Sequence, residues 1–518
     1  METIVNGAAA ASAMGAFGLL LYLRNKMKKI QGNKQQLPPS PQSLPIIGHL
    51  HHFVSSGKEP HQLFQSLAAV HGPIFSLRLG YMNVVVVSDR STAKQVLKTN
   101  DLALASRPKL ISVKHALYNF QDVVFSDYTK ELREIRKFLA MELLSAKKLD
   151  MFTNVKEDEL SWLVLTLANA SEQLNTFKMR DYLVGLTYNV ITRMLMGKRY
   201  YGAPPDDKEY EEGVAFKKVV DDAIKIGVAG SIADFFPQLE FLDWKVSQAK
   251  KVQRELDKFL QRMLDEHRVP NRGNSQEDFL DMILEASFMS DDRIKATVFD
   301  LITGGTDSSS SFLEWTLAEL IMHPQVLAKA QEEIDTVVGH GRKVKESDIP
   351  RMPYLQAVIK EGFRLHSPVP LLVPHYANQE CSINGYTIPC NTTVFVNTYA
   401  MGRDPKVWDN PLEFDPERFL SGPHKEVEVL GQNVNFELLP FGSGRRSCPG
   451  SALGNSIVHF TLATLLHCYD WKAGDKIDFA ESSGAAKIMK FPLCVQPTPR
   501  LQIQDMYVTN QYTNPIHM

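Results

Sequence analysis

The stretch that decides the fold is Phe441-Gly-Ser-Gly-Arg-Arg-Ser-Cys-Pro-Gly450, where glycines and arginines surround Cys448. Glycines permit a tight loop whose backbone can approach a flat cofactor closely. A helix is predicted over residues 452–468, so Cys448 precedes a helix amino terminus and stands near Arg445 and Arg446. Such surroundings lower the pKa of a thiol and favour the thiolate, which is a soft metal ligand. The stretch therefore predicts a metal-binding cysteine.

The other cysteines do not suggest a disulfide framework or a zinc site. The chain has five cysteines, none of them in a Cys-x-x-Cys pair, and an odd number cannot pair fully. The pair Gly442-Ser-Gly444 lacks the third glycine of a dinucleotide-binding loop. These features favour a catalytic body in a reducing compartment.

Composition indicates an ordinary globular protein. Of the 518 residues, 44% are hydrophobic and 22% charged, and the formal net charge is −2. The length suffices for one large domain or several small ones. A near-neutral charge gives no reason to expect a nucleic-acid partner.

The amino terminus departs from this average. Residues 3–23 carry no charge, and a basic cluster follows at Arg24, Lys26, Lys28, Lys29 and Lys34. About 20 uncharged residues can span a membrane as a helix, and the basic flank stays cytosolic. Residues 1–34 are therefore predicted to be a single-pass anchor of the endoplasmic reticulum membrane, with the catalytic domain in the cytosol. A cleaved signal peptide is the alternative, although its basic residues would precede the apolar stretch.

The remaining chain divides into a hinge, a body and a tail. Residues 35–45 are rich in proline, which makes a stiff spacer. Residues 46–501 predict one mainly α domain with a minor β part. Helices dominate residues 131–338, and strands are expected at 74–79, 84–87 and within 381–396, where Asn384-Gly385 marks a turn. The polar residues 502–518 are expected to be disordered.

The cysteine stretch resembles the haem-binding loop of the cytochrome P450 superfamily, Phe-x-x-Gly-x-Arg-x-Cys-x-Gly, at every fixed position. The resemblance implies the cytochrome P450 fold, haem b as cofactor and Cys448 as the axial ligand of the iron. It also implies cofactor-binding roles for Phe441, Gly444, Arg446 and Gly450.

Two further motifs follow the family in order. Glu361-Gly-Phe-Arg364 places two charged side chains on one helical face, and Pro416-Glu-Arg418-Phe419 lies downstream. In the family the first pair bonds the second arginine, so the resemblance implies a structural triad of Glu361, Arg364 and Arg418.

The segment Gly304-Gly305-Thr-Asp307-Ser308-Ser309 lies inside a run predicted to be helical, 294–320. It is similar to the part of the long P450 helix that leaves a groove for dioxygen and helps to deliver protons. Helical spacing puts Leu301, Gly304, Gly305 and Ser308 on one side of the helix, which is expected to face the iron. Asp307 and Ser308 are the implied catalytic residues. The usual threonine is replaced by Ser308, which lacks the methyl that restricts the rotamer.

Donors to the haem propionates are expected at Arg136, His375 and Arg446. In Leu132-Arg-Glu-Ile-Arg136 the family commonly has tryptophan first and arginine last, so Leu132 removes one donor. Arg136 remains able to form a charge-assisted hydrogen bond to a carboxylate.

The resemblance extends from Pro38 to Leu501, and the sequence is similar to that of the plant microsomal branch of the family. It implies a monooxygenase that takes electrons from NADPH–cytochrome P450 reductase, with molecular oxygen and an apolar small molecule as substrates and membrane lipid around its anchor. A phenolic, flavonoid or terpenoid compound is expected to bind among Ile111, Phe120, Leu301, Val369, Leu372, Val373 and Ile488. The alternatives are a haem-thiolate isomerase or dehydratase that needs no reductase, and a haem-carrying binding protein without turnover.

Overall fold

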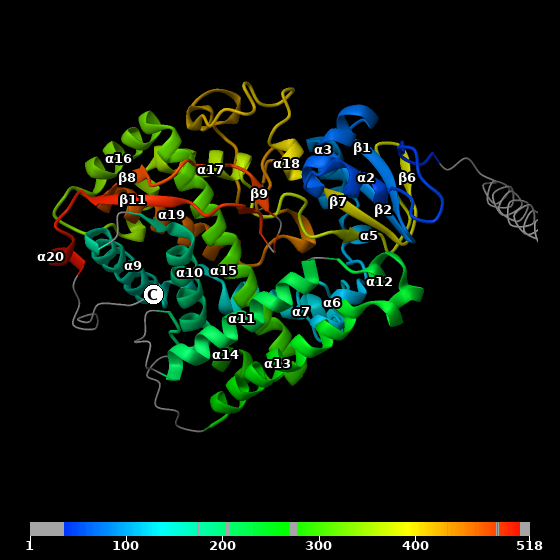
Figure 1. Cartoon of the computed structure of the whole chain (residues 1–518), viewed down its shortest axis with the longest axis horizontal. Helices are drawn as coiled ribbons and strands as arrows, with labels where there is room; N and C mark the ends of the chain where they lie inside the picture. Colours follow the sequence, from blue (N-terminus) through cyan, green and yellow to red (C-terminus); the bar gives the residue numbers. More distant parts are fainter. Residues whose placement is uncertain are drawn as a thin grey trace, which may run out of the picture.

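A computed structural model describes residues 36–507, except 174–175, 202–207, 229, 270–276, 432–433, 483 and 485. Helices form most of the described chain, and a smaller β-rich part lies at one side (Figure 1). The prediction of a mainly α domain with a minor β part is confirmed. The predicted anchor, residues 1–34, lies outside the described residues.

The helix α15 (Asp291–Met322) runs through the centre of the helical part (Figure 1). It begins at Ser290, whose side chain accepts from the backbone amide of Arg293, the arrangement expected of an N-cap. Most of its residues are buried, so it is a core helix. It contacts the helices α10 (Met179–Met196), α11 (Lys208–Val228), α13 (Trp244–His267), α16 (Pro324–Val338), α17 (Pro353–Leu365) and α19 (Ser451–Cys468).

The other helices complete the body around this centre. They include α2 (Leu50–Ser56), α3 (Pro60–His71), α4 (Arg90–Lys94), α5 (Asp101–Leu104), α6 (Ile111–Ala116), α7 (Lys130–Phe138), α8 (Ala146–Asp150), α9 (Thr153–Gln173), α12 (Ile232–Phe235), α14 (Phe279–Ala286) and α18 (Thr398–Met401).

The β-rich part is a four-stranded sheet in the order β1-β2-β7-β4. The strands β1 (Ile74–Leu79) and β2 (Met82–Val87) form an antiparallel pair, and both were predicted. β2 pairs in parallel with β7 (Thr392–Val396), with Asn83 opposite Thr392. β4 (His375–Tyr376) completes the sheet.

Short strands form three further pairings. β5 (Cys381–Ile383) and β6 (Tyr386–Ile388) are joined by the predicted Asn384-Gly385 turn, in which both residues have positive φ. β3 (Phe177–Lys178), β11 (Cys494–Pro499) and β8 (Tyr469–Ala473) make a three-stranded sheet, and β9 (Glu481–Ser482) pairs with β10 (Ile488–Met489).

The prediction of a disordered tail is wrong for its first residues. Residues 503–507 form the helix α20 (Ile503–Tyr507), in which Ile503 and Tyr507 are buried. The Tyr507 hydroxyl lies 3.3 Å from the Cys468 thiol. Burial of these two side chains holds the segment against α9. The polar composition of residues 502–518 gave no indication of this contact.

Within the described residues, no helix combines the length and the hydropathy that crossing a bilayer would require.

Candidate active site

The cysteine loop is closed by backbone contacts. The Cys448 amide donates to the Phe441 carbonyl at 2.9 Å, and Gly442 and Gly444 both have positive φ. A Cβ atom at Gly444 would lie 2.1 Å from the Leu97 carbonyl oxygen, so only glycine fits there. The loop thus requires glycine at positions 442 and 444 and leads directly into α19.

Cys448 is an exposed residue, yet burial raises the pKa of its thiol, while the Gly450 amide and Arg136 lower that pKa. The two observations agree if the thiol faces an enclosed space inside the protein. Burial therefore opposes the lowered pKa that the sequence predicts. Arg445 and Arg446 point elsewhere, to Asp101 and to backbone carbonyls respectively, so they do not offset burial.

α15 crosses the start of α19 with an open patch at Gly304. Ser309 lies 3.9 Å from the position that a Cβ atom of Gly454 would take, and the Gly454 amide donates to the Gly450 carbonyl. Gly304 is exposed in the middle of this core helix, with no atom within 4 Å of the position of an added Cβ. α15 thus contacts the start of α19 through Ser309, and Gly304, five residues earlier on α15, leaves open space.

Gly305 does not share this open face, in contrast to the expectation. Its Cβ position would lie 2.5 Å from the Ile191 side chain of α10. The residue after Gly304 is rotated by about 100° around a helix of 3.6 residues per turn, which directs it at the neighbouring helix. Gly305 therefore allows close packing of α10 against α15 rather than lining the groove.

Ser308 and Asp307 lie one turn after Gly304. The Ser308 hydroxyl donates to the Gly304 carbonyl at 2.7 Å, a back-bond common for serine in helices. Burial raises the pKa of Asp307, Lys217 of α11 lowers it, and Asp221 raises it further. Ser308 is thus held beside the open patch, and Asp307 has an increased tendency to carry a proton.

Several cations gather on the other side of the cysteine loop. Arg446 is buried and donates to the carbonyls of Ala105, Val123 and Ser126, and Arg136 donates to the Ser447 carbonyl at 2.5 Å. Arg107 is also buried and donates to the carbonyls of Val124, Val373 and Pro374.

Burial, followed by repulsion from neighbouring arginines, lowers the pKa of Arg446 to about 10 and that of Arg107 well below its usual value. Sequence reasoning missed Arg107, because an isolated arginine between two elements carries no local pattern. Asp122 offsets part of the charge, but burial raises its pKa to about 6. The cluster therefore favours an added anion.

His375 lies in β4 next to this cluster. Its Nδ1 atom donates to the Leu104 carbonyl at 3.0 Å, and burial followed by repulsion from Arg107 lowers its pKa to about 3. The neutral ring then has only a lone pair at Nε2. His375 can therefore donate from Nε2 to a carboxylate only when the ring carries a second proton.

These features fit haem. Cys448 is exposed in its loop, Gly304 leaves open space on α15, and buried arginines adjoin the loop. A planar dicarboxylate with a metal at its centre matches the three features together. Cys448 would hold the iron, and Arg136, Arg446 and Arg107 would neutralise the carboxylates.

The structure brings Glu361, Arg364 and Arg418 together behind the loop. Arg364 binds both carboxylate oxygens of Glu361 at 2.7 Å, and Arg418 donates to Glu361 at 3.1 Å. Arg364 also donates to the carbonyls of Gly402, Pro411 and Glu413. All three side chains are buried, so the triad joins α17 to the segment 402–418.

The predicted wall residues share the same degree of burial. Ile111, Phe120, Leu301, Val369, Leu372, Val373 and Ile488 are all half-buried. Leu372 has a φ of 51°, which is strained for a residue with a side chain, and its Cδ1 atom lies 3.7 Å from the Cβ position of Gly442. The turn after α17 thus approaches the cysteine loop directly.

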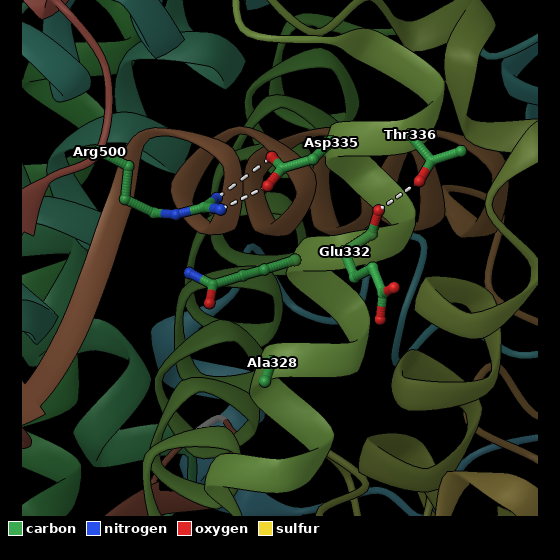
Figure 2. Close-up of a pocket in the computed structure, with 6 residues that line it drawn as sticks. Ala328, Glu332, Asp335, Thr336 and Arg500 are labelled. Atoms are coloured by element: carbon green, nitrogen blue, oxygen red, sulfur yellow. Dashed lines mark hydrogen bonds and ion pairs between the residues drawn. The ribbon is translucent and has the colours of Figure 1, made fainter.

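A surface hollow of about 440 Å³ beside α16 is a different feature (Figure 2). Arg500 pairs with both oxygens of Asp335, at 2.5 Å to the nearer one, and the Thr336 hydroxyl donates to the Glu332 carbonyl. Asp335 also lies near His340 and His467 in a spacing that could hold a metal. Its pairing with Arg500 already satisfies the carboxylate, so the hollow carries no assignment.

Comparison with known proteins defines the class. The family model described as Cytochrome P450 matches residues 38–495. A zebra fish cytochrome P450 solved with progesterone superposes with a TM-score of 0.72 at 27% identity, covering 86% of this chain and 100% of that chain. The chain belongs to the cytochrome P450 family and is an oxidoreductase of the monooxygenase type. The family implies a haem cofactor.

Two similar proteins come from plants. The chain is 39% identical to the flavonoid 3'-monooxygenase of Arabidopsis thaliana, over 92% of this chain and 94% of that protein. It is 38% identical to the isoflavone 2'-hydroxylase of Glycyrrhiza echinata, over 89% and 91% respectively.

Proposed function

We propose that the protein hydroxylates a plant phenolic compound of the flavonoid type, with haem b as cofactor and electrons from NADPH through a separate reductase. The observation that carries the proposal is the exposed Cys448 in its glycine loop, combined with the open space at Gly304 of α15. The plant relatives named for flavonoids support the substrate class.

The wall residues would bind and orient such a substrate. The side chains of Ile111, Leu301, Val369, Val373 and Ile488 are apolar and half-buried. Apolar walls favour a flat aromatic molecule and exclude water from the reacting position. Haem ligated by a thiolate supplies the activation of dioxygen, because the thiolate pushes electron density that favours O–O cleavage.

The chain's own residues would manage protons and the cofactor's charge. The Ser308 hydroxyl, held at the Gly304 carbonyl, is a donor beside the open patch. Asp307, whose pKa is raised, can replenish that proton. Arg136, Arg446 and Arg107 would hold the two carboxylates.

The test is coexpression with a plant reductase in microsomes. With NADPH, a flavanone such as naringenin should gain one oxygen atom, and omission of the reductase should stop the reaction. Conversion without the reductase would favour the isomerase or dehydratase alternative. Failure across a flavonoid panel, with terpenoids converted instead, would overturn the substrate class.

Ser308→Ala should uncouple oxygen consumption from product formation. A positioned proton donor typically contributes about 10²–10⁴-fold to a rate, and the variant loses the hydroxyl beside Gly304. Product formed per NADPH should fall, and hydrogen peroxide release should rise. Ser308→Thr is the matched control and should couple as well as the wild type or better, because its methyl limits χ1. Wild-type coupling in Ser308→Ala would remove Ser308 from the proton path.

We further propose that residues 1–34 anchor the protein in the endoplasmic reticulum membrane and that a reductase docks on the basic side chains of Arg133, Lys137, Lys147 and Lys148. Three of these are exposed and Lys148 is half-buried. An acidic partner fits such a surface.

A variant that begins at Gln35 should still load haem, because the cations and the cysteine loop lie far along the chain. The measurement is the reduced carbon-monoxide difference spectrum of the truncated protein, together with membrane fractionation. A truncated protein that folds without haem would contradict the proposal that residues 1–34 serve only as an anchor.

A further inference from the structure

A buried lysine lies directly before Ile488, one of the predicted wall residues, and belongs to none of the sequence motifs. Lys487 is 3% exposed and precedes Ile488. Its ammonium lies 3.0 Å from Glu481, 3.3 Å from the Leu365 carbonyl and 4.9 Å from the centre of the Trp315 ring. Lysine is rarely buried in this way without a partner that binds its charge.

Glu481 connects this lysine to the amino-terminal helix α3. The other carboxylate oxygen of Glu481 lies 2.6 Å from His61 and 2.7 Å from the Gln62 amide. The pKa of Glu481 is lowered to about 2, because bonds from His61 and attraction by Lys487 outweigh burial. The carboxylate is therefore ionised and can balance the lysine charge.

His366 connects the lysine to α15. Its Nδ1 atom lies 3.4 Å from the Lys487 ammonium and its Nε2 atom 2.6 Å from Glu319. Burial and three nearby cations lower the pKa of His366 well below its usual value. The ring is neutral, accepts from Lys487 at Nδ1 and donates from Nε2 to Glu319, and it stacks on Trp315 at 4.5 Å.

The backbone of Lys487 is also held by hydrogen bonds. Its amide donates to the Pro368 carbonyl at 2.7 Å. Its carbonyl accepts from the Ser311 hydroxyl and from the Trp315 indole at 3.0 Å. Ser311 lies about 4.5 Å along the helix axis from Ser308, at 1.5 Å per residue. The segment 486–488 is thus held one turn beyond the proposed proton donor.

We propose that Lys487 is a positioning residue that fixes the segment 486–488 against α15 and the turn after α17, and thereby sets which ligands fit above the haem. The proposal rests on the proposed function, in which Ile488 faces the substrate. Without the ammonium, the carboxylates of Glu481 and Glu319 would lose a buried counterion. An unpaired buried charge admits water or moves the segment.

The experiment compares two ligands that bind the iron through nitrogen. Imidazole is small and should not reach residue 488, whereas clotrimazole carries three aryl rings and must contact the walls. The full-length, haem-loaded protein is titrated with each, and the Soret shift gives the dissociation constants. Lys487→Met should weaken the binding of clotrimazole at least about tenfold, because the segment 486–488 loses the buried counterion that holds it in place. Imidazole should bind as in the wild type.

Three further variants make the result specific. Lys490→Met alters an exposed lysine three residues after Lys487 and should change neither dissociation constant. Ser311→Ala removes one bond to the Lys487 carbonyl and should weaken clotrimazole about threefold, the effect of one hydrogen bond. Adding Glu481→Gln to Lys487→Met should restore part of the clotrimazole affinity, because it removes the uncompensated carboxylate.

A clotrimazole-to-imidazole ratio that is unchanged or moves the opposite way in Lys487→Met overturns the proposal. If that variant fails to load haem, the same criterion applies to Ser311→Ala. The azole titrations measure binding without turnover, so this result is independent of the proposed activity. A wild type that binds both azoles but oxidises no flavonoid contradicts the proposed substrate alone.

Discussion

Cys448→Ser should abolish the thiolate signature in the reduced carbon-monoxide difference spectrum and remove monooxygenase turnover completely. A serine hydroxyl is harder and far less acidic than a thiol, so it cannot supply the same electron density to the iron. The cations that would hold the carboxylates remain in the variant. Haem is therefore expected to bind with an altered spectrum rather than to be lost entirely.

The matched control is Cys390→Ser. Cys390 is exposed and lies between β6 and β7, away from the cysteine loop. The Cys390→Ser variant should keep both the spectrum and the turnover of the wild type. A Cys448→Ser protein that kept the Soret band of the wild-type complex would show that another residue ligates the iron.

Glu361→Gln should prevent accumulation of haem-loaded protein. Glu361 is fully buried and accepts bonds from Arg364, Arg418 and the Asp415 amide. Neutralising it leaves two buried guanidinium groups without their counterion, which typically costs about 3–5 kcal/mol. Domains are stable by only about 5–15 kcal/mol, so the loss is a large fraction of the total.

The measurements are the yield of haem-loaded protein and the midpoint of thermal unfolding. Glu417→Gln makes the same change one residue before Arg418, at an exposed pair with Lys329. Exposed pairs contribute about 0–1 kcal/mol, so this control should behave as the wild type. Equal yields and midpoints for both variants would show that the triad does not stabilise the fold.

Local patterns explain why much of the site could be predicted from sequence. The cysteine loop, the Glu361–Arg364 pair and the glycines of α15 are short motifs whose spacing fixes their geometry within one loop or one helix. The strands β1 and β2 and the helix α19 follow in the same way from alternation and apolar runs. These elements were placed to within one or two residues.

The remaining features depend on contacts between distant segments. The direction of Gly305 is set by Ile191, and the pKa of Cys448 by burial that outweighs its basic neighbours. Arg107 becomes part of the site only because residues 373–374 and 446 fold against it. The order of α20 depends on a pocket for Tyr507 beside Cys468. No local pattern contains this information.

The parallel pairing of β2 with β7 has a consequence for synthesis in the cell. The two strands are separated by roughly 300 residues of chain, and ribosomes add about 5–20 residues per second. β2 therefore waits for its partner for roughly 15–60 s after it is made. The loop at Gly444, which packs on Leu97, is translated later still. The residues that would hold haem are therefore brought together only when the polypeptide is nearly complete, and until then the nascent β1–β2 hairpin has an edge without its partner strand.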